Sequence, residues 1–90
     1  MLAQWVTSMP DIELSTHAKD MLIERNLTEE WVWRTIRTPD RKRRNPEDGN
    51  MHYTRAIPEA LGRILRVVVD EGFQPNRIVT VFFDRRLRKT

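Results

Sequence analysis

The chain has 90 residues, of which 39% are hydrophobic and 32% charged, with a formal net charge of +3 and no cysteine. This length supports one modest core, so we expect a single α+β domain over residues 11–84, preceded by a flexible lead (1–10) and followed by a basic tail (85–90). The composition excludes disulfides and thiolate metal sites, and no stretch approaches the roughly 20 apolar residues of a membrane span. We therefore expect a cytoplasmic protein without membrane contact.

The positive charge is concentrated in the later part of the chain. Residues 1–33 carry a net charge of −4 and the remainder +7. Most of the bases are Arg, which favours bidentate contacts with phosphate or carboxylate groups. The densest run is Arg41, Lys42, Arg43 and Arg44. It has two interpretations: it binds an anion, or it is a solvated edge strand whose charge prevents aggregation.

The first element predicted in chain order is a very short extended segment over residues 11–14. Either Ser15 or Thr16 then caps a helix, because hydroxyl side chains satisfy the free N–H groups of a first helical turn. Apolar residues at helical spacing carry this helix to about Asn26.

A second helix is predicted directly after the first. Thr28 is its N-cap, and Glu29 and Glu30 occupy the first turn, where the helix dipole favours acidic side chains. The helix runs to about Arg37 and stops before Pro39, since the residue preceding a proline is driven out of the helical conformation.

From residue 40 onward the hydrophobic period changes from helical to alternating. We predict strands over residues 40–44, 51–57, 63–70 and 77–84, separated by turns rich in Pro, Gly and Asn. Their inward residues in the last two strands are Leu65, Val67, Val69, Val79, Val81 and Phe83. The expected fold is α+β, with two N-terminal helices packed on a curved antiparallel sheet of about four strands.

His17 is the first candidate for chemistry. It falls in the first turn of the first predicted helix, where a neutral imidazole can act as a general base. The alternative is a structural histidine that caps the helix or packs on a strand. Arg25 lies too far along the same helix to contact His17 directly, but both can border one groove.

Tyr53 and Arg55 share one face of a predicted strand, whereas His52 points to the other face. A Tyr or His beside an Arg suits metal-independent cleavage of RNA, because attack by the 2′-hydroxyl needs a base, an acid and a cation for the phosphorane charge. The alternative for this pair is a half-buried Tyr beside a solvated Arg.

Arg66 interrupts the apolar run of residues 64–69. A strand buried on both faces would not tolerate an unpaired charge. Either its face is open to solvent and ligand, or Arg66 pairs with a carboxylate such as Glu13 or Glu24. Thr80 is predicted on the same face and is a further binding candidate.

No metal or cofactor is expected. The two histidines are widely separated, and the chain has no HExxH, EF-hand, GxGxxG or P-loop pattern.

Several segments together resemble one family, and they are Leu14-Ser15-x-His17-Ala18, Glu24-Arg25-Asn26-Leu27-Thr28, Thr38-Pro39-Asp40 and the two valine-rich strands. The family is the domain of unknown function DUF4258, and the resemblance covers about residues 12–84. In element order this family is similar to the RelE/ParE-like toxins and to the barnase and colicin ribonucleases, which hold RNA on an antiparallel sheet. The resemblance implies a site made of His17, Arg25, Tyr53, Arg55 and Arg66.

The function expected from these observations is that of a toxin-like, metal-independent ribonuclease or an RNA-binding domain. His17 or Tyr53 would act as general base or acid, and Arg55 and Arg66 would stabilise the phosphorane. The strand over residues 41–44 would grip the backbone, and cleavage would leave a 2′,3′-cyclic phosphate. The alternative is a non-catalytic module that binds an acidic, antitoxin-like protein.

Overall fold

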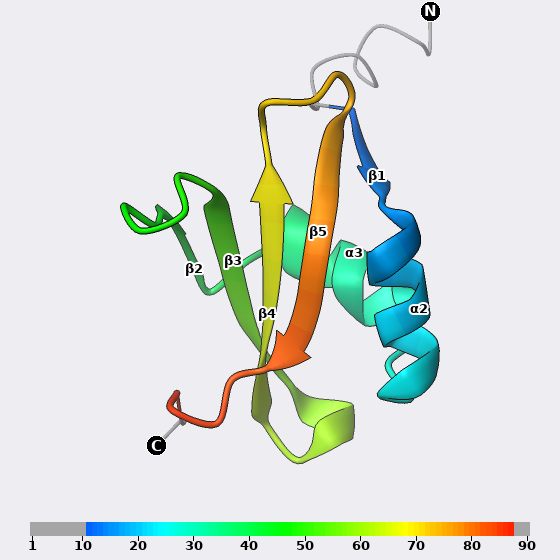
Figure 1. Ribbon diagram of the computed structural model, residues 1–90. Helices are drawn as coiled ribbons and strands as arrows, with labels where there is room; N and C mark the ends of the chain where they lie inside the picture. The colour runs from blue at the N-terminus through cyan, green and yellow to red at the C-terminus, as the bar shows by residue number, and fades with distance from the viewer. Residues whose placement is uncertain (1–10, 88–90) are drawn as a thin grey trace, which may run out of the picture.

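The computed structural model describes residues 11–87, which form a five-stranded sheet with two α-helices (Figure 1). The strands are β1 (Ile12–Leu14), β2 (Arg41–Arg44), β3 (Met51–Ile57), β4 (Arg63–Asp70) and β5 (Asn76–Phe83). The helices are α2 (Thr16–Glu24) and α3 (Glu29–Arg37), and a short 3-10 helix, η1, spans Pro58–Ala60. The strand order is β1-β5-β4-β3-β2. The predicted lead, residues 1–10, and residues 88–90 of the predicted tail lie outside the described residues.

The predicted sheet of about four antiparallel strands is wrong in strand number and in one strand direction. β1 is a fifth strand and pairs with β5 in parallel, whereas the other three strand pairs are antiparallel. Beyond the ladder, the Ser15 N–H donates to the carbonyl of Ile78 over 3.0 Å. Three residues are too few to show the alternation from which strands are predicted, and their partner lies near the other end of the chain.

Both helices begin at hydroxyl caps. Ser15 Oγ accepts the N–H of Ala18 at 3.0 Å, and Thr28 Oγ1 accepts the N–H of Trp31 at 3.3 Å. The structure thereby confirms Thr28 and selects Ser15 from the two predicted caps. α2 ends short of Asn26, whose φ of 55° is left-handed and terminates the helix.

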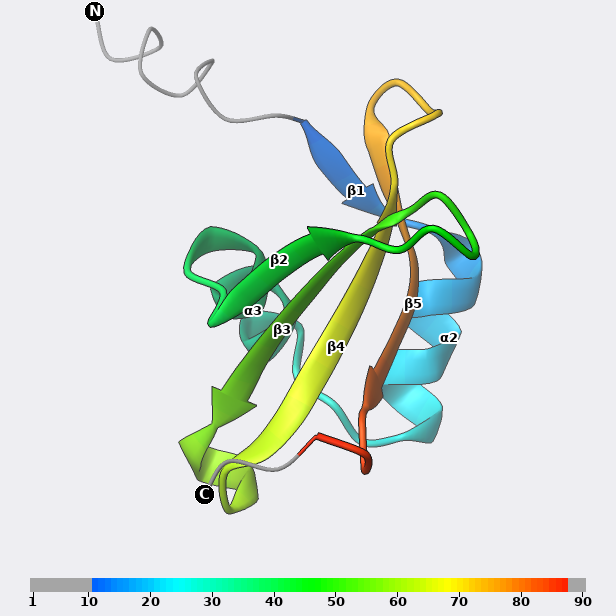
Figure 2. The same cartoon turned by 90° about the vertical axis from the view of Figure 1, so that its left-hand side faces the viewer.

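The two helices occupy different positions around the sheet (Figures 1 and 2). α3 packs on one face, against β3 and β4, whereas α2 lies along β5. β1 pairs with only the first part of β5, and α2 follows the remainder of that edge. There the guanidinium of Arg25 donates to the carbonyl of Val81 at 3.0 Å, which satisfies a backbone acceptor of the edge strand. No described helix covers the face of β3 and β4 opposite α3.

The core lies between the sheet and the helices. Its fully buried residues on β4 and β5 are Leu65, Val67, Val69, Ile78 and Val81. The prediction of Val79 as an inward residue is wrong, because the register shifts between Val68 and Val69 and places Ile78 opposite Val69. A bulge adds one residue to a strand, and alternation in the sequence does not reveal where.

Candidate functional site

One face of the sheet gathers cationic side chains, and we call it the basic face. It comprises Arg41, Arg43, His52, Arg66, Phe82 and, from the turn after β5, Arg86. Residues paired across antiparallel strands point to the same side of a sheet, and the register aligns Arg41, Arg66 and Phe82 in one row through Thr54. Since their strand neighbours Tyr53 and Leu65 join the core beneath α3, the basic face is the opposite one.

His52 is held between Asp48 and Arg66. Asp48 Oδ2 lies 2.9 Å from His52 Nε2, and Nη1 of Arg66 lies 2.9 Å from His52 Nδ1. Because a guanidinium can only donate, Nδ1 accepts, and Nε2 carries the proton that is donated to Asp48. A neutral imidazole in this tautomer satisfies both contacts, and the ring is only 7% exposed.

Asp84 binds two guanidiniums. Arg66 donates Nε and Nη2 to Asp84 Oδ2 at 2.9 and 2.8 Å. Arg86 donates its backbone N–H at 3.0 Å and its Nε at 3.3 Å to Oδ1, and the backbone contact forms a turn that brings Arg86 over the sheet. Burial would raise the pKa of the Asp84 carboxyl, but hydrogen bonds from Arg86 and Arg66 lower it to about 2.

These guanidiniums border a hollow of about 380 Å³. Arg43 and Arg86 are exposed beside it, and Arg66 forms part of its wall. Asp84 is already saturated by its two partners, while Glu47 adds a single carboxylate to the rim. Three guanidiniums around one hollow suit a tetrahedral or planar anion such as phosphate or carboxylate.

A pH dependence of stability follows from the Asp84 carboxyl. Its folded pKa of about 2 lies below the value of about 3.9 typical of an unfolded Asp. The stabilisation is therefore complete above about pH 4 and is lost as the pH falls toward about 2. Glu59 acts in the same direction, because a hydrogen bond from Arg34 lowers its pKa to about 2.

We expect the free energy of unfolding, measured by urea titration, to fall between about pH 4 and about pH 2. Asp84→Asn and Glu59→Gln should each make this fall shallower. A wild-type curve with no change over that interval would contradict the ion pairs described.

The pleat of β2 sends the other two members of the basic run to the α3 side of the sheet. Nζ of Lys42 lies 5.3 Å from the centre of the Tyr53 ring. Arg44 donates to Glu71 at 2.8 Å and to the carbonyl of Gly49 at 2.9 Å. The four predicted binding residues of this run are thus divided between two surfaces.

Tyr53 and Arg55 lie on the face opposite Arg66. Tyr53 is 4% exposed and belongs to the hydrophobic core. Arg55 donates to the carbonyl of Thr38 and lies 4.0 Å from Asp40, so it fastens the connection between α3 and β2. Its Nε is buried without a hydrogen-bond partner among the described residues. The structure therefore does not bring this pair together with Arg66.

The remaining candidates lie on or beside α2. His17 is exposed on that helix and lines neither the hollow of the basic face nor the one next to it. Arg25 and Thr80 border this neighbouring hollow, of about 520 Å³, and the Thr80 hydroxyl contacts Sδ of Met21 at 3.2 Å.

His52, Asp84 and Arg86 are not among the predicted site residues. Asp84-x-Arg86 has a local signal, since an Asp side chain often accepts the backbone N–H two residues on. His52 follows four residues after Asp48 across a turn. The pairing with Arg66 has no local signal, because it depends on the register of β3, β4 and the end of β5.

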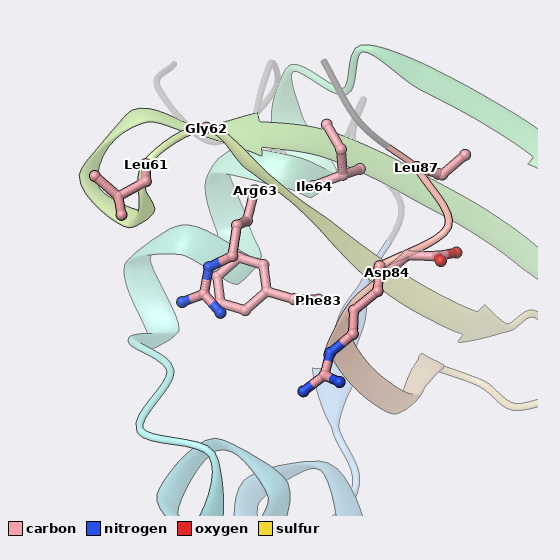
Figure 3. A pocket seen from close by; sticks show the side chains of 8 residues that line it. Leu61, Gly62, Arg63, Ile64, Phe83, Asp84 and Leu87 are labelled. Carbon is pink, nitrogen blue, oxygen red and sulfur yellow. The ribbon is translucent and has the colours of Figure 1, made fainter. Parts of the chain in front are cut away.

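A third hollow, of about 340 Å³, lies at the ends of β4 and β5 (Figure 3). The guanidinium of Arg63 lies over the Phe83 ring, 4.1 Å from its centre, and Leu61 at the rim is 95% exposed. Figure 3 shows the Asp84 carboxylate turned away from the Phe83 ring. This hollow is therefore separate from the Asp84 contacts that organise the basic face.

Within the described residues no helix is long and apolar enough to cross a membrane, and no three His, Asp or Glu side chains are grouped as metal ligands. Comparisons with curated proteins and with solved structures find no match. Residues 14–83 match the family described as Domain of unknown function (DUF4258), which confirms the predicted resemblance over most of the chain. The chain belongs to the DUF4258 family.

Proposed function

We propose that this domain binds RNA, with the phosphate backbone lying across the basic face. The observation that carries the proposal is the convergence of Arg43, Arg66 and Arg86 on one hollow. Guanidiniums that are already oriented lose little freedom when they bind a phosphate, and Asp84 orients both Arg66 and Arg86.

The arrangement of the rest of the face supports an extended ligand. Arg41 stands in the same row as Arg66, and Arg43 stands in the next row beside His52. Both Arg residues of β2 are exposed, so a chain of phosphates crossing from β5 to β2 meets a cation at each end. A single small anion would leave Arg41 unused.

The test is the salt dependence of binding to a labelled mixed-sequence RNA, measured by fluorescence anisotropy. With about three phosphates contacted on a single strand, log K should fall against log salt with a slope of roughly −2. A flat slope, or no binding at about 50 mM salt, would contradict the proposal. The same charges would then point to an acidic protein as the partner.

Metal-independent cleavage is a second candidate, favoured by the chain Asp48–His52–Arg66. Asp48 orients the imidazole from Nε2, as a second carboxylate does in many general bases. His52 Nδ1 faces Arg66, so it becomes available to a 2′-hydroxyl when Arg66 turns toward a phosphate. The likeness to RelE/ParE-like toxins stays a prediction.

Cleavage is tested by incubating the protein and RNA in EDTA and analysing the product ends, beside His52→Gln and His17→Ala variants. Cyclic-phosphate ends that disappear with His52→Gln and persist with His17→Ala would establish His52 as the base. Loss with His17→Ala alone would favour the base predicted from the sequence. Intact RNA in every lane would leave binding as the function.

A further inference from the structure

Phe82 is the apolar member of the basic face. It is paired with Arg66 in the register of β4 and β5, and its side chain is half-buried. It lines the hollow of about 380 Å³ with Arg43, Arg66 and Arg86. It also lines the neighbouring hollow of about 520 Å³, whose cations include Arg25 and Arg85. The ring therefore stands as a shared wall between two hollows that are each bordered by guanidiniums.

The ring of Phe82 differs from those of the other two phenylalanines. A guanidinium covers Phe83, where Arg63 lies 4.1 Å from the ring centre, and another covers Phe73, where Arg77 lies at 4.0 Å. Within residues 11–87 no aromatic ring or guanidinium stacks on Phe82. Its neighbour Arg66 is instead held by Asp84 and His52.

A bare aromatic ring between two cationic hollows matches the chemistry of an unpaired nucleotide. The flat face of a base can stack on the ring, while the phosphates on either side of that nucleotide enter the two hollows. A duplex keeps its bases stacked on one another, so it can offer its phosphates but no free base face. The ring thus distinguishes single strands from duplexes, which phosphate contacts alone do not.

We propose that Phe82 stacks on a base and makes the domain selective for single-stranded RNA. This inference rests on the proposed function and deepens it, because it names the class of RNA. Arg66 and Arg86 hold the phosphate on one side of the stacked nucleotide, and Arg25 and Arg85 hold the phosphate on the other side.

The experiment compares binding of an oligouridine of about eight nucleotides with binding of a blunt RNA duplex. The variants are Phe82→Leu, which keeps apolar volume without a ring, and Phe82→Trp, which keeps a stacking surface. Phe73→Leu is the matched control, because it removes an exposed phenylalanine from the loop between β4 and β5, away from both hollows. Thermal melts of all variants verify that they are folded.

We expect Phe82→Leu to weaken oligouridine binding by about fivefold to a hundredfold, with the salt slope unchanged. Phe82→Trp should bind as wild type does, Phe73→Leu should have no effect, and duplex binding should not change in any variant. Salt-dependent binding that Phe82→Leu leaves intact, or equal affinity of the wild type for both RNAs, would overturn the stacking role while preserving the proposed function. Absence of salt-dependent RNA binding in the wild type would overturn both.

Discussion

Replacing Asp84 with Ala is expected to lower the free energy of unfolding by about 2–4 kcal/mol. The Asp84 side chain is 3% exposed and that of its partner Arg66 is 16% exposed, so the substitution leaves a largely buried guanidinium without its counter-charge. It also removes the acceptor of the turn that positions Arg86. Urea unfolding of the two proteins at neutral pH measures the difference.

Asp48→Ala is the matched control for this prediction. Asp48 belongs to the same hydrogen-bonded chain, but its side chain is 41% exposed and water can replace its contact with His52. We expect a much smaller loss of stability than for Asp84→Ala. Equal losses for the two variants would contradict the view that Asp84 is the organising carboxylate of the basic face.

The second large effect is expected for RNA binding by the double variant Arg43→Gln/Arg86→Gln. Both side chains are exposed and border the central hollow, so their replacement removes two phosphate contacts without opening the core. Each lost contact should reduce the salt slope by about 1 and affinity by about tenfold. Anisotropy titrations at two salt concentrations give both quantities.

The control is Lys19→Gln/Arg37→Gln, which changes the net charge by the same amount. Lys19 and Arg37 are exposed on α2 and α3 and lie outside the central hollow. If affinity depended only on net charge, the two double variants would lose it equally. A loss confined to Arg43→Gln/Arg86→Gln would locate the RNA on the basic face.

The local elements were predictable because their signals are local. Thr28 with Glu29 and Glu30 marks the start of α3, and the turn residues before Met51 separate β2 from β3. These features depend on contacts within a few residues, which the sequence displays directly.

The long-range features were not predictable in this way. β1 joins the sheet only because β5 offers a free edge, and the bulge at Val68 and Val69 decides that Ile78 faces the core. Each of these depends on the register between segments that are distant in the sequence.

The candidate site shows the same division. Arg66 stood out as a charge inside an apolar run, and it does lie on a face that no described helix covers. Its predicted carboxylate partners were Glu13 and Glu24, whereas the structure pairs it with Asp84. Asp84 follows the last strand, so its proximity to Arg66 depends on how β5 is aligned with β4.

The most direct test of RNA binding on the basic face is a titration of isotopically labelled protein with oligouridine, followed by backbone amide NMR shifts. The account predicts that the largest shifts map to Arg43, His52, Arg66, Phe82 and Arg86, with α3 unaffected. Shifts that map instead to α3 and the α3-facing residues of β2, or no shifts at low salt, would contradict it.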